Sequence, residues 1–238
     1  MKFFSLESIL IMTPILLIAL PFHELAHAWV AYKLGDNTAK DKGRLTLNPF
    51  KHLDLIGTIM MFTIGFGWAK PVPINPNNFK QPRKGTVLVS VAGPLSNIIL
   101  AFVGTFIGGI IAKLLVAGVI PLTGINVRIL FYVSLFFYIL VFVNINLAIF
   151  NMIPIPPLDG SRVLSSFVPE KSYESFARFE PFIGLAFLAL VVLFPNNFLG
   201  NFMRAVTEPI RNSMAFVTQS ILGINAENPF WLIMQGQV

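Results

Sequence analysis

Four long stretches of the chain carry almost no formal charge, and this feature limits the possible folds more than any other. Between Glu7 and Lys33 the only charged residue is Glu24, and three later stretches carry none. A helix needs about 20 apolar residues to cross the hydrocarbon layer, so each stretch is long enough to span a bilayer. The sequence therefore predicts an all-α polytopic membrane protein with about four transmembrane helices. The predicted helices cover residues 8–32, 86–112, 129–152 and 181–203.

The composition agrees with a membrane protein and restricts the chemistry. Hydrophobic residues make up 55% of the 238 residues and charged residues 12%, with a mean hydropathy of +0.74. A soluble domain carries roughly 25% charged residues. The chain has no cysteine, which excludes a thiol nucleophile and a disulfide framework. Any metal must therefore be bound by nitrogen and oxygen atoms.

The net charge of +6 lies in one segment of the chain. Between Lys33 and Lys84 there are nine basic residues and three acidic ones, and the rest of the chain sums to zero. Next to apolar helices, such an excess indicates the cytoplasmic side of a membrane. We expect this segment to contact anionic lipid headgroups, and we expect no nucleic-acid partner.

Residues 55–73 predict an element that does not cross the membrane. The apolar part is shorter than the four stretches above and is interrupted by Gly57, Gly65 and Gly67, and two prolines follow at Pro71 and Pro73. These residues favour a re-entrant element or a short β element over a long helix. We therefore interpret residues 1–203 as one membrane domain and residues 204–238 as a tail on the membrane surface.

The first apolar stretch contains the sequence His23-Glu24-Leu25-Ala26-His27. Two histidines four residues apart are separated by about 40° around a helix, so both can bind one ion. In this H-E-x-x-H pattern the histidines are zinc ligands and the glutamate is the general base of a metalloprotease. The alternative is a pair of buried histidines that form hydrogen bonds between helices. Ionisable groups inside a membrane are rare and are usually functional, which favours the metal site.

A third ligand is expected near the end of the third span. If residues 55–69 do not cross, that end lies on the same side of the membrane as His27. The sequence there contains Pro154, Pro156 and Pro157, which cannot continue a regular helix, and then Asp159. A carboxylate oxygen from Asp159 would complete a set of two histidines and one aspartate. The alternative role for Asp159 is to cap the helix or turn that follows.

The chain resembles the site-2 protease family of intramembrane zinc metalloproteases, in its compact bacterial and archaeal branch without a PDZ or CBS domain. The resemblance implies that His23, His27 and Asp159 hold one Zn²⁺ ion per chain and that Glu24 activates the attacking water. It rests on five motifs, which are residues 23–27, 43–49, 67–73, 92–97 and 151–160.

Two asparagines are candidates for stabilising the tetrahedral intermediate. Asn151 belongs to the same motif as Asp159 and is the first choice for an oxyanion donor. Asn97 interrupts an apolar stretch, where an amide needs a partner, and is the second. A hydrogen bond between helices is an equally good interpretation of Asn97.

These features together predict an enzyme that cuts transmembrane segments of other membrane proteins. We expect it in the cytoplasmic membrane of a prokaryotic cell, with the active site toward the cytoplasm. The alternative function is a metal-ion transporter or channel, in which the same ligands would form a transit site. An inactive relative that only binds substrate is a third interpretation.

Overall fold

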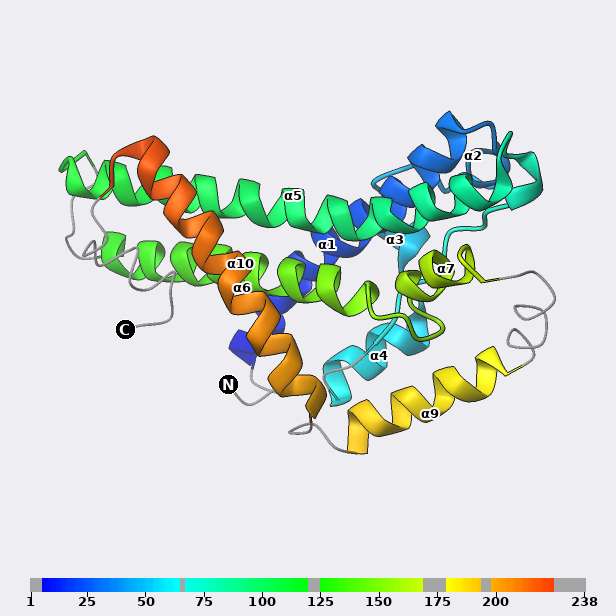
Figure 1. The fold of residues 1–238 in the computed structure, drawn as a ribbon. Helices are drawn as coiled ribbons and strands as arrows, with labels where there is room; N and C mark the ends of the chain where they lie inside the picture. Colours follow the sequence, from blue (N-terminus) through cyan, green and yellow to red (C-terminus); the bar gives the residue numbers. More distant parts are fainter. Residues whose placement is uncertain (1–5, 65–66, 120–124, 169–178, 194–197, 225–238) are drawn as a thin grey trace.

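The computed structural model describes residues 6–64, 67–119, 125–168, 179–193 and 198–224. Helices dominate this part of the chain, as Figure 1 shows. The helices are α1 (Leu6–Lys33), α2 (Thr38–Asp41), α3 (Pro49–His52), α4 (Leu55–Ile64), η1 (Pro76–Asn78), α5 (Pro82–Val116), α6 (Ile125–Asn151), α7 (Asp159–Ser165), α9 (Glu180–Leu193) and α10 (Phe198–Leu222).

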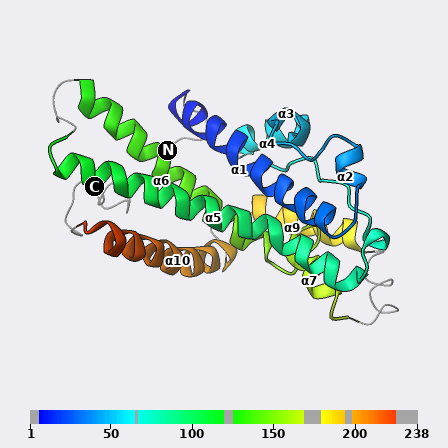
Figure 2. The ribbon, with the colours of Figure 1, turned by 90° about the horizontal axis from the view of Figure 1, so that it is seen from above.

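Three of the four predicted spans are confirmed as long apolar helices. Within the described residues, the segments that are long and apolar enough to cross a membrane are Ile9–Lys33, Pro82–Leu115 and Arg128–Asn151. They belong to α1, α5 and α6, which pack on one another (Figures 1 and 2). Apolar side chains fill the contacts, for example Ile15 of α1 against Leu140 of α6. This three-helix unit is the frame of the molecule.

Of the fourth predicted span, residues 181–203, the structure describes α9 and the first residues of α10, while residues 194–197 lie outside the described residues. Helix α9 has 14 residues, which at 1.5 Å per residue gives about 21 Å, too short for a hydrocarbon core of about 30 Å. The predicted domain boundary at residue 203 lies inside α10, which has 25 residues and packs along α5 and α6. Met214 of α10 is buried in the same cluster as Ala101 and Val141. Residues 225–238 of the predicted tail lie outside the described residues, so its place on the membrane surface stays a prediction.

Residues 55–64 form helix α4, so the β alternative is wrong for these residues, while the re-entrant alternative stays a prediction. Asp54 caps this helix, because its carboxylate accepts a hydrogen bond from Gly57 N at 2.8 Å. Gly57, which favours a turn by residue type, lies inside this capped helix. Ten residues give about 15 Å, so α4 cannot cross the bilayer.

After α4, residues 67–75 run as an extended segment, which we call the strap. The strap contains the isolated antiparallel bridge that the structure describes, between Leu53 and Ala69. Lys70 N donates to His52 O at 2.7 Å, and Asn75 N donates to Asp36 Oδ2 at 2.8 Å. The strap is therefore attached at both ends and passes over the C-terminal half of α1.

Candidate metal centre

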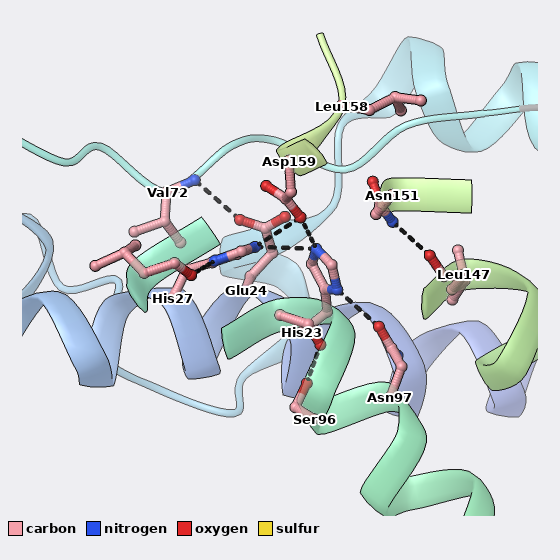
Figure 3. A network of polar contacts seen from close by, with 12 residues as sticks. His23, Glu24, His27, Val72, Ser96, Asn97, Leu147, Asn151, Leu158 and Asp159 are labelled. Atoms are coloured by element: carbon pink, nitrogen blue, oxygen red, sulfur yellow. Dashed lines mark hydrogen bonds and ion pairs between the residues drawn. The ribbon is translucent and has the colours of Figure 1, made fainter. Parts of the chain in front are cut away.

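His23 and His27 lie one turn apart on α1 and direct their Nε2 atoms toward the same point (Figure 3). The two Nε2 atoms are 3.0 Å apart, and both side chains are buried. This convergence follows from the helical period, which places residues i and i+4 on one face.

Asp159 reaches the two histidines because the chain turns sharply after α6. The three prolines between Asn151 and Asp159 end the helix, and α7 starts at Asp159 itself. Gly160 permits this turn, since a Cβ there would lie 2.7 Å from Ile153 O and closer still to Met152 O. Asp159 Oδ2 lies 3.2 Å from the Nε2 atom of each histidine. The structure thus brings together the three predicted ligands.

Hydrogen bonds on the far side of the rings assign the protonation of both histidines. His27 Nδ1 lies 2.7 Å from Val89 O, which can only accept, so Nδ1 carries the proton. For His23 the partner is Asn97 Oδ1, at 2.7 Å. In their neutral form both rings therefore present the lone pair of Nε2 to the centre.

The orientation of the Asn97 amide is itself fixed by a chain of hydrogen bonds. Leu140 O accepts from Asn144 Nδ2 at 2.8 Å, and Asn144 Oδ1 accepts from Asn97 Nδ2 at 2.7 Å. Asn97 Oδ1 is left facing His23, where it accepts the proton of Nδ1. Such partners behind a ligand orient the ring and raise its basicity.

The three converging atoms fit a bound cation. Two imidazole lone pairs and a carboxylate oxygen are all acceptors, and Asp159 Oδ2 is buried with no hydrogen-bond donor. Zinc at about 2.0–2.1 Å from tetrahedrally arranged ligands would keep those ligands about 3.3–3.4 Å apart, close to the 3.0–3.2 Å observed here. Two histidines and a carboxylate, with one position left open, form the ligand set of a catalytic zinc site.

Helix α5 covers the two imidazoles through a glycine. A Cβ on Gly93 would lie 2.6 Å from Cε1 of both His23 and His27, and closer still to His27 Nε2. Only glycine, which has no Cβ, leaves room for both imidazole rings at this position. Gly93 therefore allows α5 to pack directly over the ligands.

Glu24 lies beside the ligands and is held by the strap. Its Oε2 atom accepts a hydrogen bond from Val72 N at 2.9 Å, and the side chain is buried. Figure 3 shows the carboxylate next to Asp159 and His27. Glu24 thus occupies the position expected of a base next to the metal site.

The two candidate asparagines occupy different positions. Asn97 is fully buried behind His23, and both ends of its amide are used in the hydrogen-bond chain described above. Asn151 lines the cavity next to the centre, but its Nδ2 atom donates to Leu147 O of its own helix at 3.0 Å. Neither amide points at the three ligand atoms (Figure 3).

A cavity of about 1000 Å³ opens from the metal centre. Its walls come from α1, α6, α9, α10 and the strap, and most of the lining is apolar. Leu16 and Leu20 of α1 line it, as do Phe142 and Leu147 of α6. Glu24 and the three ligand residues thus form part of the wall of a mostly apolar cavity.

Sequence reasoning missed several groups that hold the site. The proton of His27 is accepted by the Val89 carbonyl, and the Glu24 carboxylate is held by the Val72 amide. Nearly every residue has a main-chain N–H and C=O, so the sequence does not indicate which of these groups make the contacts. Gly93 did have a signal, because it interrupts an apolar span directly before Pro94.

The chain is similar to proteins named as zinc metalloproteases. It is 46% identical over 190 residues to "Putative zinc metalloprotease YwhC" of Bacillus subtilis (strain 168), covering 79% of this chain and 82% of that protein. The sequence profile of Peptidase family M50 matches residues 105–194. The chain belongs to peptidase family M50. This is the site-2 protease family, as the sequence motifs predicted.

More distant members of the family carry similar names. The Rip2 protein of Mycolicibacterium smegmatis (strain ATCC 700084 / mc(2)155) is 28% identical over 74% of this chain and 63% of its own length. The MJ0611 protein of Methanocaldococcus jannaschii (strain ATCC 43067 / DSM 2661 / JAL-1 / JCM 10045 / NBRC 100440) is 32% identical over 60% of this chain and 63% of its own length. No solved structure gives a significant match. Together with the three apolar helices, M50 membership makes this chain a metalloprotease and an integral membrane protein.

Proposed function

We propose that this M50 protein is an intramembrane zinc protease that hydrolyses peptide bonds within transmembrane segments of other membrane proteins. His23, His27 and Asp159 would hold one Zn²⁺ ion per chain. The single observation that carries the proposal is the convergence of three acceptor atoms within 4.8 Å of one another, beside a buried glutamate and a large apolar cavity.

Glu24 is suited to move a proton at this site. When bound, zinc polarises a carbonyl group and lowers the pKa of water from 15.7 to about 7. The Val72 amide holds Glu24 Oε2, which leaves Oε1 to accept a proton from the attacking water. Glu24 can then return that proton to the leaving amine.

The two asparagines receive different roles in this mechanism. Asn97 orients His23, since its amide faces the ring and is occupied on both sides. Asn151 remains our candidate for the oxyanion donor, because it lines the cavity. To donate to a substrate, the Asn151 side chain must release Leu147 O and turn toward the cavity.

The basic segment supports an orientation with the site toward the cytoplasm. It begins at Lys33, six residues after the second histidine, and contains α2, α3, α4 and the strap. By the positive-inside rule this side faces the cytoplasm, where anionic lipids contact it. We propose the cytoplasmic membrane of a prokaryotic cell as the location, and a membrane-spanning protein as the substrate.

The test combines metal analysis with cleavage of a single-span test substrate by the purified protein. We expect one zinc per chain, cleavage that a chelator abolishes, and an inactive Glu24→Gln variant that still binds zinc. Glu208→Gln is the matched control, because Glu208 is exposed on α10 and lines no part of the cavity. A metal transporter does not need a base next to its ligands. A Glu24→Gln variant that moves zinc across vesicles while the wild type cleaves nothing would therefore favour transport.

A further inference from the structure

The peptide group between Pro71 and Val72 has a charged side chain at each end. Its N–H donates to Glu24 Oε2 at 2.9 Å, and its carbonyl accepts from Arg44 Nη1 at 3.2 Å. Arg44 Nη2 also donates to Lys70 O at 2.6 Å. A cation and the proposed base are thus joined through one peptide group of the strap.

This arrangement fixes the direction of the Val72 N–H. A peptide group is planar, so an arginine that holds the carbonyl on one side points the N–H to the other. If this group were rotated, its carbonyl oxygen would face the carboxylate of Glu24, and two acceptors would repel each other. Pro71 and Pro73 have no N–H, so Val72 is the one residue of this triplet that can donate to Glu24. The planar fork of arginine suits two neighbouring carbonyls, which a lysine cannot match.

Arg44 is itself held firmly. Its side chain is buried, and its backbone N donates to Ala39 O at 2.8 Å. His52 Nε2 donates to Thr46 O at 2.7 Å, which leaves His52 Nδ1 as an acceptor 3.5 Å from Arg44 Nη2. Burial lowers the pKa of Arg44 below its usual value, and the negative charge of Glu24 opposes this shift. An arginine remains protonated at neutral pH under these conditions.

We propose that Arg44 is a positioning residue for Glu24, acting through the Pro71–Val72 peptide group. Arg44 contacts neither the ligand atoms nor a substrate. It sets the strap so that the Val72 N–H holds one carboxylate oxygen of Glu24 and leaves the other toward the cavity. The catalytic part of this proposal rests on the proposed function, whereas the link from Arg44 to Val72 can be measured without turnover.

The first measurement compares kinetics and zinc content of three variants of the full chain. In Arg44→Met we expect kcat to fall about ten- to a hundredfold, as it does when a supporting contact of an active site is lost, with one zinc still bound and KM changed by less than about threefold. Arg44→Lys keeps the charge and loses the fork, so its kcat should be intermediate. Lys42→Met is the matched control, because Lys42 is exposed two residues away and contacts no strap carbonyl.

The second measurement follows hydrogen exchange of the Val72 amide by mass spectrometry. We expect exchange to become at least about tenfold faster in Arg44→Met and in Glu24→Ala, because each variant removes one end of the bridge. The Asn75 amide, which is bonded to Asp36, serves as an internal reference and should keep its protection. Lys42→Met should leave both amides unchanged.

Three results would overturn the proposal. The first is a wild-type kcat in Arg44→Met, and the second is a loss of activity that only follows lost zinc or lost folded protein. The third is unchanged protection of the Val72 amide. If Arg44→Met does not fold, Arg44→Lys decides the question, with a fall in kcat of about three- to tenfold expected. If the wild type cleaves nothing, the proposed function fails, and faster exchange in both variants would still establish the bridge.

Discussion

Replacing Gly93 by alanine should disrupt the metal centre without touching a ligand. The new Cβ would lie 2.6 Å from Cε1 of both His23 and His27, whereas ordinary contact starts at 3.4 Å. The rings or helix α5 must therefore move by at least about 0.8 Å, and further to clear His27 Nε2. Zinc–ligand distances tolerate changes of only about 0.2 Å. The required shift is at least four times this tolerance, so the three ligands cannot all stay in place.

The expected result is a loss of zinc affinity of at least about tenfold, with about 1–3 kcal/mol of destabilisation from overpacking. Zinc content after dialysis against a chelator series measures the affinity, and thermal unfolding in detergent measures the stability. Gly104→Ala is the matched control on the same helix. Its Cβ would lie 3.2 Å from Val141 Cγ2, a flexible contact far from the ligands, so zinc binding should be unchanged.

A Gly93→Ala variant that binds zinc as tightly as the wild type would contradict the predicted loss of affinity. A Gly104→Ala variant that loses zinc to the same extent would contradict the specific role of Gly93, because α5 would then act only through general packing. A Gly93→Ala protein that unfolds earlier and yet keeps full zinc affinity would show that the helix, and not the ligand rings, gives way.

Three further predictions follow from the surroundings of the site. Asn97→Ala should lower zinc affinity about 10–100-fold by freeing the His23 ring, as measured by chelator competition, and unchanged affinity would remove its orienting role. Gly160→Ala should weaken zinc binding in the same assay, because its Cβ meets backbone oxygen at the end of α6, and wild-type binding would contradict this. Burial raises the pKa of Asp36, but the hydrogen bonds it accepts outweigh burial and bring the pKa below 3.8. Asp36 therefore stabilises the fold above pH 3.8, and this contribution is lost as the pH falls further. The difference in melting temperature between wild type and Asp36→Asn should shrink on acidification. A difference that stays constant would show that the Asp36 carboxylate does not stabilise the fold in this way.

The sequence predicted the parts of this molecule that depend on residue type and spacing. Three apolar helices follow from the absence of charge, and the approach of Asp159 to His23 and His27 follows from the helical period and the prolines after α6. A side-chain amide in an apolar span needs a hydrogen-bond partner. The sequence therefore indicated correctly that Asn97 has a polar neighbour. That the neighbour is His23 depends on how α1 packs against α5, and spacing along the chain does not encode this.

The failures of prediction have specific physical causes. The β alternative for residues 55–64 is wrong because Gly57, which favours a turn by residue type, lies in a helix that Asp54 caps. Charged residues on α10 conceal the apolar face that this helix packs against α5 and α6, so the hydropathy pattern does not show that contact. The Val72 and Val89 contacts use the main chain, and any residue at those positions except proline at 72 could make them.

The ligands come from two helices that are far apart in the sequence, α1 and α7, in a chain that has no cysteine. A bound ion would act as the cross-link that a disulfide supplies in secreted proteins. It would join the last turns of α1 to the first residue of α7. Binding of an ion would then couple the positions of α1 and α7, and its removal would cost the fold this link.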